Sequence, residues 1–355
     1  MNKLTKWWLD YKELDNHDYR MVNMTCPELG IVEPDEWEYY EQQVRSRIPF
    51  GETLTNHQLY IETSATKLID SLFDKYMDDD TLLITSVVEH EAVENNVIKH
   101  DRVEKDHVKL HYVNGIKDLN LQQVKEAIMK KHYKRAFVYV IGTQITTGEV
   151  TPQEFYVKIR EYLESKGIEV ILTIDDVHGM YLIPRDYTIF DYVISTSHAI
   201  VRRWDMGILW SKTNENFGKK YVNWVACYLR CLDIVLDKQD KLTQFSYVMK
   251  EEFSKQLAGC PYLQYISDSV PHIFSIRVEC PARLAYTKEM WQDMADHEVR
   301  IETKNYDTDN IFYIRMRGAQ YITFPGLLPD AVHMVNSLLD RIAILKSTLN
   351  EDNYD

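Results

Sequence analysis

From about residue 64 onward, apolar runs of strand length alternate with amphipathic segments of helical period. The apolar runs lie at 81–88, 136–144, 170–176, 191–197 and 206–212. The helical patterns lie at 64–77, 119–133 and 155–167. Continuous apolar strands between helices are typical of a parallel sheet that is covered on both faces. The sequence therefore predicts an α/β fold with a mostly parallel central sheet flanked by helices.

The pattern changes after about residue 245, where helical and strand segments are fewer and farther apart. Helical patterns lie at 245–259, 288–297 and 328–349, and strand patterns lie at 272–279 and 310–317. This order predicts a smaller C-terminal α+β domain. We expect an N-terminal arm at 1–45, a large α/β domain at 46–245 and the small domain at 246–355.

Composition narrows the class of protein. Of the 355 residues, 45% are hydrophobic and 27% are charged, as in ordinary globular proteins. No signal-peptide pattern or apolar run of membrane-spanning length is present, so a cytoplasmic location without a membrane is expected. The formal charge of -14 argues against nucleic acid as a partner. Five scattered cysteines fit reduced thiols, and no metal site is expected.

Unusual polar residues follow four of the predicted strands. They are Glu89 and His90, then Gln144 to Gly148, then Asp175 to His178, and then His198 and Ala199. A single histidine or aspartate at such a place is usually a structural group or a helix cap. In open α/β sheets, however, ligands bind just beyond the carboxyl ends of the strands. The four loops together therefore predict a ligand site at that edge.

Three segments carry a resemblance to a known family. LLITSVVEHEAVENN (82–96), VILTIDDVHG (170–179) and DYVISTSHAIVRRWDMGILW (191–210) resemble the class V aminotransferase and cysteine desulfurase branch of fold-type-I pyridoxal 5'-phosphate (PLP) enzymes. The resemblance extends from about residue 60 to about 320. It implies the fold of PLP-dependent transferases of type I, PLP as the cofactor, and a homodimer.

The same resemblance assigns roles to residues around the pyridine ring. It implies that His90 stacks on the ring, that Asp175 pairs with the ring nitrogen and that His178 lies close to the phenolic oxygen. A carboxylate at that place has a physical purpose, because it keeps the nitrogen protonated and the ring able to accept electrons. Asp176, one position on, is interpreted as a helix or turn cap.

Further segments resemble the family's phosphate and substrate contacts. The resemblance places phosphate ligands at Thr196, Ser197 and His198, and at the helix start formed by Ser64, Ala65 and Thr66, which is similar to a Gly-Ala-Thr turn. A helix start and hydroxyl groups are suitable donors for a phosphate dianion. The segment QITTGEVTP (144–152) offers Gln144 and Thr146 as further polar contacts to the cofactor.

The strand IFYIRMRG (311–318) resembles the family strand whose arginine binds the substrate carboxylate. Arg315 matches that arginine, and Arg317 is a second candidate, since a guanidinium binds a carboxylate through two parallel hydrogen bonds. The expected substrate is a small-molecule amine or amino acid. No cysteine lies between 300 and 312, where the desulfurases carry their catalytic thiol, so desulfurase activity is not expected.

Ala199 falls on the lysine that holds PLP covalently and moves the Cα proton. Three explanations are open: a deliberate Lys→Ala substitution that traps a substrate adduct, a native enzyme that uses His198 or His90 as its base, or a catalytically silent protein. The expected function is that of a PLP enzyme acting at the Cα of an amino acid, by transamination, decarboxylation or another lyase reaction. The alternative is a non-catalytic or histidine-based PLP-binding protein on the same scaffold.

Overall fold

The computed structural model describes most of the N-terminal two thirds of the chain and scattered parts of the rest. The described residues are 34–100, 106–110, 121–144, 148–197, 206–213, 217, 224–225, 228–229, 232–233, 236, 251, 255, 258, 263–265, 273–279, 299–302, 311–317, 340, 343 and 347. The chain forms two compact units, one of 26–145 and 149–233, and one of 1–25, 146–148 and 234–355. The domain boundaries expected from the sequence stay a prediction.

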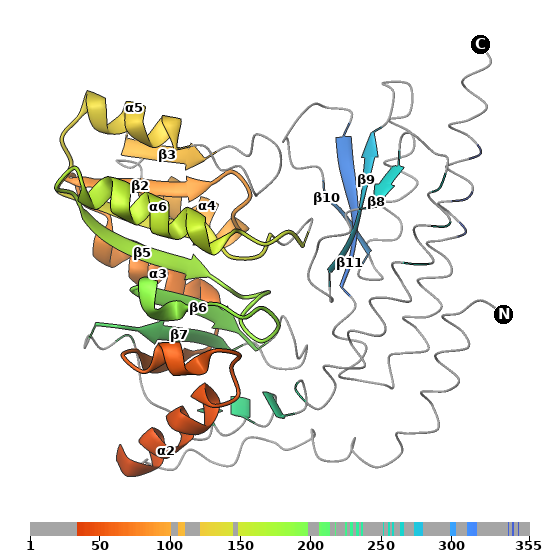
Figure 1. Cartoon of the computed structure of the whole chain (residues 1–355), viewed down its shortest axis with the longest axis horizontal. Helices are drawn as coiled ribbons and strands as arrows, with labels where there is room; N and C mark the ends of the chain where they lie inside the picture. Colours follow the sequence, from red (N-terminus) through yellow and green to blue (C-terminus); the bar gives the residue numbers. More distant parts are fainter. Residues whose placement is uncertain are drawn as a thin grey trace. The chain divides into compact units, whose positions relative to one another are not determined.

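The unit of 26–145 and 149–233 contains a seven-stranded sheet (Figure 1). Its order is β1 (Gln58–Glu62), β7 (Gly207–Ser211), β6 (Tyr192–Thr196), β5 (Glu169–Asp175), β4 (Arg135–Ile141), β2 (Thr81–Ser86) and β3 (His107–Leu110). Neighbouring strands from β6 to β3 are parallel, and β7 pairs antiparallel with both β6 and β1. The predicted mostly parallel sheet is confirmed.

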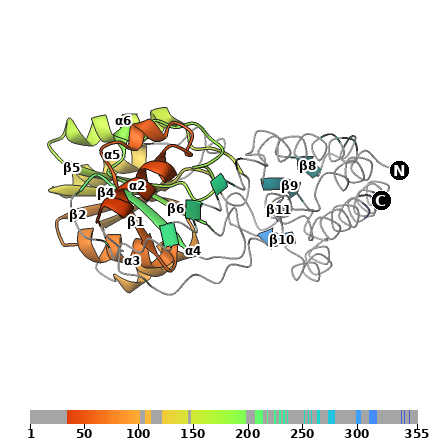
Figure 2. The same cartoon turned by 90° about the horizontal axis from the view of Figure 1, so that it is seen from below.

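Helices cover both faces of this sheet. The helices α3 (Ala65–Tyr76) and α4 (Glu91–Lys99) lie on one face, and α5 (Gln122–Lys130) and α6 (Gln153–Glu164) lie on the other (Figure 2). The helical patterns at 64–77, 119–133 and 155–167 therefore predict α3, α5 and α6 to within a few residues. The remaining described elements that are named in this unit are α2 (Pro34–Arg45) and the short 3-10 helices η2 (Gly51–Leu54) and η5 (Tyr187–Ile189).

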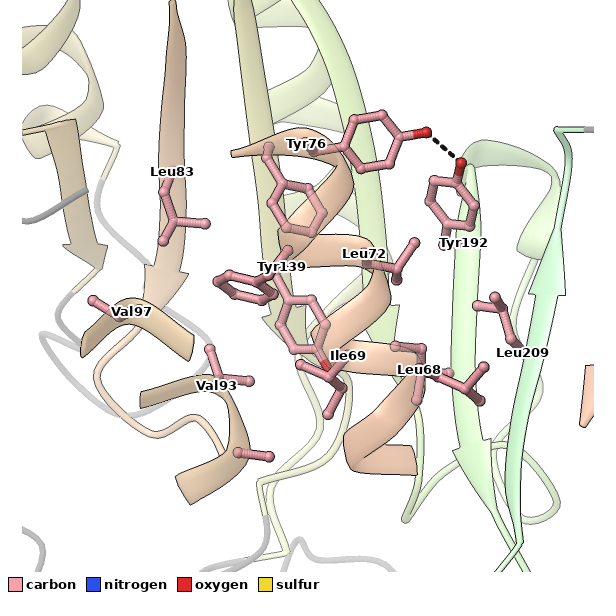
Figure 3. Packing of buried hydrophobic residues seen from close by; sticks show 14 of the residues in the cluster. Leu68, Ile69, Leu72, Tyr76, Leu83, Val93, Val97, Tyr139, Tyr192 and Leu209 are labelled. Carbon is pink, nitrogen blue, oxygen red and sulfur yellow. Dashed lines mark hydrogen bonds between the residues drawn. The ribbon is translucent and has the colours of Figure 1, made fainter. Parts of the chain in front are cut away.

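The core beneath α3 explains why this helix forms where it does. Its apolar residues Leu68, Ile69 and Leu72 recur at helical spacing and are fully or almost fully buried. Figure 3 shows them packed against Tyr139 of β4 and Leu209 of β7. Burial of each such side chain contributes about 1.5–3 kcal/mol. The packing fixes α3 on the sheet and so fixes the position of its N-terminus.

The other unit contains a four-stranded antiparallel sheet. Its order is β10 (Val299–Glu302), β11 (Ile311–Arg317), β9 (Ile273–Glu279) and β8 (Leu263–Tyr265). The strand patterns at 272–279 and 310–317 correspond to β9 and β11, whereas β8 and β10 are too short to stand out in the sequence. The predicted helix at 288–297 lies outside the described residues. Within the part of the chain that the structure describes, no helix is both long and apolar enough to cross a membrane.

Candidate functional site

Four parallel strands end at the same edge of the sheet. The last residues of β2, β4, β5 and β6 are Ser86, Ile141, Asp175 and Thr196. Ile141 lies opposite Asp175 in the β4–β5 register, and Gly142 N–H donates to the Asp175 carbonyl at 2.7 Å. The loops that carry the predicted site residues therefore begin side by side, as parallel pairing requires.

Asp175 is the last residue of β5, and its side chain is buried. Its Oδ2 accepts a hydrogen bond from the Tyr139 hydroxyl at 2.9 Å, and its Oδ1 accepts one from Val177 N–H at 3.3 Å. Burial raises the pKa of Asp175 to about 6, although both hydrogen bonds oppose that rise. The site therefore holds a carboxyl group whose negative charge would be stabilised by a cation placed beside it.

Glu89 is a second buried acid at this edge. Its Oε1 accepts from Ser86 N–H at 3.1 Å, from the Ser86 hydroxyl and from Ile141 N–H at 3.1 Å. These bonds join the loop after β2 to the end of β4. Burial raises the pKa of Glu89 to about 8, and the nearby Asp175 charge acts in the same direction.

The two histidines of the predicted site differ in environment. His90 is exposed and caps α4, where its Nδ1 accepts from Ala92 N–H at 3.1 Å. His178 is buried in the loop that follows Asp175. Gln144 is buried in the loop after β4, and its N–H donates to the Glu149 carbonyl at 2.8 Å.

Asp176 corrects one interpretation made from the sequence, because its carboxylate is not a helix or turn cap. The side chain is fully buried, directly after the end of β5. Its Oδ2 accepts from the Tyr187 hydroxyl at 2.8 Å and lies 3.3 Å from Nε of Arg185. The partners lie 9 and 11 positions later in the chain, beyond what local sequence pattern reveals.

The predicted phosphate-binding helix start lies beside the end of β6. Ser64 is the N-cap of α3, and its hydroxyl accepts from Lys67 N–H at 3.4 Å. Gly207, which pairs with Thr196, packs against the peptide that joins Ser64 to Ala65. A Cβ on Gly207 would stand 2.3 Å from the Ser64 carbonyl carbon and 2.5 Å from the Ala65 nitrogen. A glycine is therefore required for this close approach.

Thr196 and Ser197 are buried at the end of β6 and directly after it. The Thr196 hydroxyl donates to the Met206 carbonyl at 2.8 Å, and the Ser197 hydroxyl accepts from Met206 N–H at 3.1 Å. The two hydroxyls thus join the end of β6 to Met206, the residue before β7. The proposed phosphate contacts would have to be made in addition to these bonds.

The other predicted site residues fall into three groups. Thr146, His198 and Ala199 lie outside the described residues. Arg315 and Arg317 lie on β11, which belongs to the other compact unit, where Arg315 pairs with Ser275 of β9. Thr66 is exposed in the first turn of α3, and Ala65 is half-buried there.

The structure adds residues that the sequence analysis did not select. Tyr139 was hidden in the apolar run 136–144, where a hydroxyl between two valines was the only signal. Arg185 and Tyr187 follow the predicted loop that carries His178. A charged residue beside apolar positions was again the only signal. Their roles depend on which strands pair and on which faces their side chains project.

No protein-family model and no curated protein matches the sequence. Solved structures do match. A NifS-like protein from Rickettsia africae shares 12% identity and a TM-score of 0.62, over 94% of this chain and 96% of that one. A PLP-bound C-S lyase from Staphylococcus hominis shares 10% identity and a TM-score of 0.61, over 92% and 88%.

A lysine-to-alanine mutant of C-DES, with glycine covalently linked to its PLP cofactor, shares 15% identity and a TM-score of 0.58, over 96% of this chain and 91% of that one. Such likeness extends over nearly the whole chain at low identity, so it establishes architecture. The chain therefore has the fold of the fold-type-I PLP-dependent enzymes.

Proposed function

We propose that this chain binds PLP at the carboxyl edge of its seven-stranded sheet and belongs to a lineage of enzymes that act at the Cα of an amino acid or an amino-acid-bearing substrate. The observation that carries the proposal is Asp175. Its carboxyl group is buried at the end of β5, and two hydrogen bonds orient it. A buried acid with a raised pKa in such a place is typical of a functional site.

The described residues fit this cofactor. The carboxylate of Asp175 would bind a protonated ring nitrogen, and its ionised form would gain the counter-charge that burial otherwise withholds. The N-terminus of α3 would receive the phosphate, since the first N–H groups of a helix have no intrahelical acceptor. PLP, when bound, supplies a ring that withdraws electrons from a bond to Cα.

We propose the remaining roles from the family resemblance of the sequence. We assign His90 to the face of the ring, and His178 to the phenolic oxygen. Gln144 and Thr146 supply polar contacts from the loop after β4. Thr196, Ser197 and His198 assist the helix in holding the phosphate. Arg315 and Arg317 are assigned to the substrate carboxylate, and a homodimer in the cytoplasm is the proposed assembly.

Ala199 sets the limit on activity. A methyl group neither holds PLP covalently nor moves a proton, so lysine-dependent turnover requires a lysine at this position. We propose that the chain with Ala199 binds PLP together with an amine but turns over only when a lysine is restored. The C-DES mutant supports this, because a chain of similar fold with alanine for lysine holds PLP linked to glycine. Transamination and decarboxylation or another lyase reaction are equally compatible with the proposal.

The test is the visible absorption spectrum of the Ala199→Lys variant with PLP, compared with that of the unchanged chain. We expect a yellow band in the variant that withstands gel filtration and responds to one class of amino acid. Ala199→Met is the matched control, because methionine has a side chain of similar length to that of lysine but no amine. Turnover by the unchanged chain would favour the histidine-based alternative, and a folded Ala199→Lys protein without a band would refute the PLP assignment.

A further inference from the structure

A buried arginine lies beside Asp176, the residue that follows the end of β5. Arg185 is 4% exposed. Its Nε lies 3.3 Å from Oδ2 of Asp176, and its two terminal nitrogens donate to the carbonyls of Thr151 at 3.0 Å and Gly142 at 2.6 Å. One guanidinium thus contacts one side-chain carboxylate and two backbone carbonyls. A planar group with five donors can do this, whereas a lysine ammonium on its flexible stem cannot reproduce the geometry.

Gly142 and Thr151 are the two ends of the loop that follows β4. They are joined by a hydrogen bond from Thr151 N–H to the Gly142 carbonyl at 2.9 Å. Inside the loop, Gln144 N–H donates to the Glu149 carbonyl at 2.8 Å. Arg185 therefore closes the base of the loop that carries Gln144.

Asp176 connects the same arginine to the loop that carries His178. A Cβ on Gly142 would stand 2.6 Å from Oδ1 of Asp176, and a Cβ on Gly179 would stand 2.2 Å from the same atom. The Asp176 carboxylate therefore fills the space between the β4 loop and the β5 loop, and both loops must present a glycine to it. Burial raises the pKa of Asp176, while the Arg185 charge beside it acts against that rise.

A buried ion pair is weak evidence of stability, because removing two charges from water costs about as much as their attraction returns. A buried ion pair can, however, make directional hydrogen bonds to other groups, which a pair of apolar side chains cannot make. Here those groups are the carbonyls of Gly142 and Thr151, which lie outside the pair itself. The arrangement specifies where two loops stand relative to each other.

We propose that Arg185, together with Asp176, is a positioning residue. It fixes the loops after β4 and β5 to each other and thereby places Gln144 and His178 beside Asp175. The claim that these side chains are placed to bind PLP rests on the proposed function. The claim that Arg185 fixes the loop after β4 does not.

The test compares the Asp176→Asn/Arg185→Met double variant with the unchanged chain. The double variant preserves shape and leaves no lone buried charge, but it loses the donors to both carbonyls. Arg160→Met is the matched control, because Arg160 is a partly buried arginine whose guanidinium pairs with Asp191 at 2.6 Å and with Glu164 at 3.4 Å. Three quantities are measured: the thermal midpoint, amide hydrogen exchange at Gln144 and Thr151, and the dissociation constant of PLP.

We expect the double variant to fold, to exchange the Gln144 and Thr151 amides faster than the unchanged chain, and to bind PLP about 10-fold more weakly, the scale of loss when a group that orients a site's ligands is removed. β-strand amides and the Arg160→Met protein should not change in exchange. Unchanged exchange or unchanged PLP affinity in a folded double variant would overturn the inference.

If the double variant does not fold, Arg185→Lys decides. It keeps the buried charge but cannot reach both carbonyls, so the loop amides should still lose protection, and full protection would overturn the inference. Failure of the unchanged chain to bind PLP is a different result. It would refute the proposed function, and hydrogen exchange would still decide whether Arg185 holds the loop.

Discussion

The Tyr139 hydroxyl donates a hydrogen bond to Oδ2 of Asp175 at 2.9 Å across the β4–β5 pair, and both side chains are buried. This bond favours the ionised carboxyl group, whereas burial favours the neutral one and raises the pKa to about 6. If ionised Asp175 binds the ring nitrogen, PLP affinity should fall as the pH is lowered through about 6.

Tyr139→Phe should move this fall in affinity to higher pH. The substitution removes only the hydroxyl donor, so the pKa of Asp175 rises further and less of the carboxyl group is ionised at neutral pH. The measurement is PLP binding by absorbance or fluorescence from pH 5 to pH 9. Tyr156→Phe is the control, because its hydroxyl donates to the Ile141 carbonyl at 3.1 Å on the other face of the sheet. Identical pH profiles for the two variants would contradict the role given to Tyr139.

Asp175→Asn should weaken PLP binding and yet stabilise the protein without PLP at pH 8. The pKa of Asp175 is about 6 when folded and 3.8 in the reference state, so between these values the folded chain binds more protons than the unfolded one. Stability therefore decreases as the pH rises through this interval, and above it the ionised group costs up to about 3 kcal/mol.

Urea unfolding at pH 8 measures the expected gain in unfolding free energy of Asp175→Asn, with Asp186→Asn as the control. Asp186 is an exposed aspartate that accepts a hydrogen bond from Thr188 N–H at 2.9 Å. It should give little or no gain. A loss of stability in Asp175→Asn would show that the carboxylate supports the fold rather than PLP binding.

The sequence predicted the sheet better than the site. Buried parallel strands such as β4 and β5 are continuous apolar runs, so their pattern is strong even without neighbours. In contrast, β3 has only four residues, His107–Leu110, and its pattern of apolar and polar positions is too short to identify. Local pattern decides the first kind of element, and pairing with a neighbour decides the second.

Within the site, positions along the chain were predictable and partners were not. Asp175 and His178 were selected because they lie at the end of a buried strand and because this segment resembles a known family. The contact between Tyr139 and Asp175 depends on strand register, and the ion pair of Asp176 depends on the path of the chain to Arg185. Neither the strand register nor the course of the chain after β5 produces a periodic pattern in the sequence.

Glu89→Gln should flatten the dependence of stability on pH. The pKa of Glu89 is raised from 4.5 to about 8, chiefly by burial, so the folded chain keeps a proton that the unfolded chain releases near pH 4.5. The unchanged protein should lose stability between about pH 4.5 and pH 8, and the variant should lose less. Glutamine imitates the neutral acid, and its carbonyl can still accept from Ser86 and Ile141 N–H.

Denaturant unfolding at pH 6 and pH 9 separates this effect from a general change in stability. The unfolding free energy of Glu89→Gln minus that of the unchanged chain should increase by at least about 1 kcal/mol from pH 6 to pH 9. Glu94→Gln, on the exposed side of α4, is the control and should follow the unchanged chain. Parallel profiles for all three proteins would mean that Glu89 is ionised at neutral pH.

Gly207→Ala should displace the start of α3 and so weaken binding at the proposed phosphate site. The new Cβ would stand 2.3 Å from the Ser64 carbonyl group, which is backbone and has no rotamer to move to. The start of α3 must then shift away from β7, at a cost of about 1–3 kcal/mol for overpacking. PLP affinity should fall with it, because the N–H groups of that helix start move with Ser64.

Gly167→Ala separates loss of stability from loss of the site. Gly167 ends the turn after α6 at a φ of 75°, with nothing within 4 Å of the new Cβ. Its cost is the strain of a left-handed residue, about 1–2 kcal/mol, without any contact with α3. If Gly207→Ala loses PLP affinity and Gly167→Ala does not, at comparable thermal midpoints, the α3 start binds the phosphate. Equal affinities would place the phosphate elsewhere at the sheet edge.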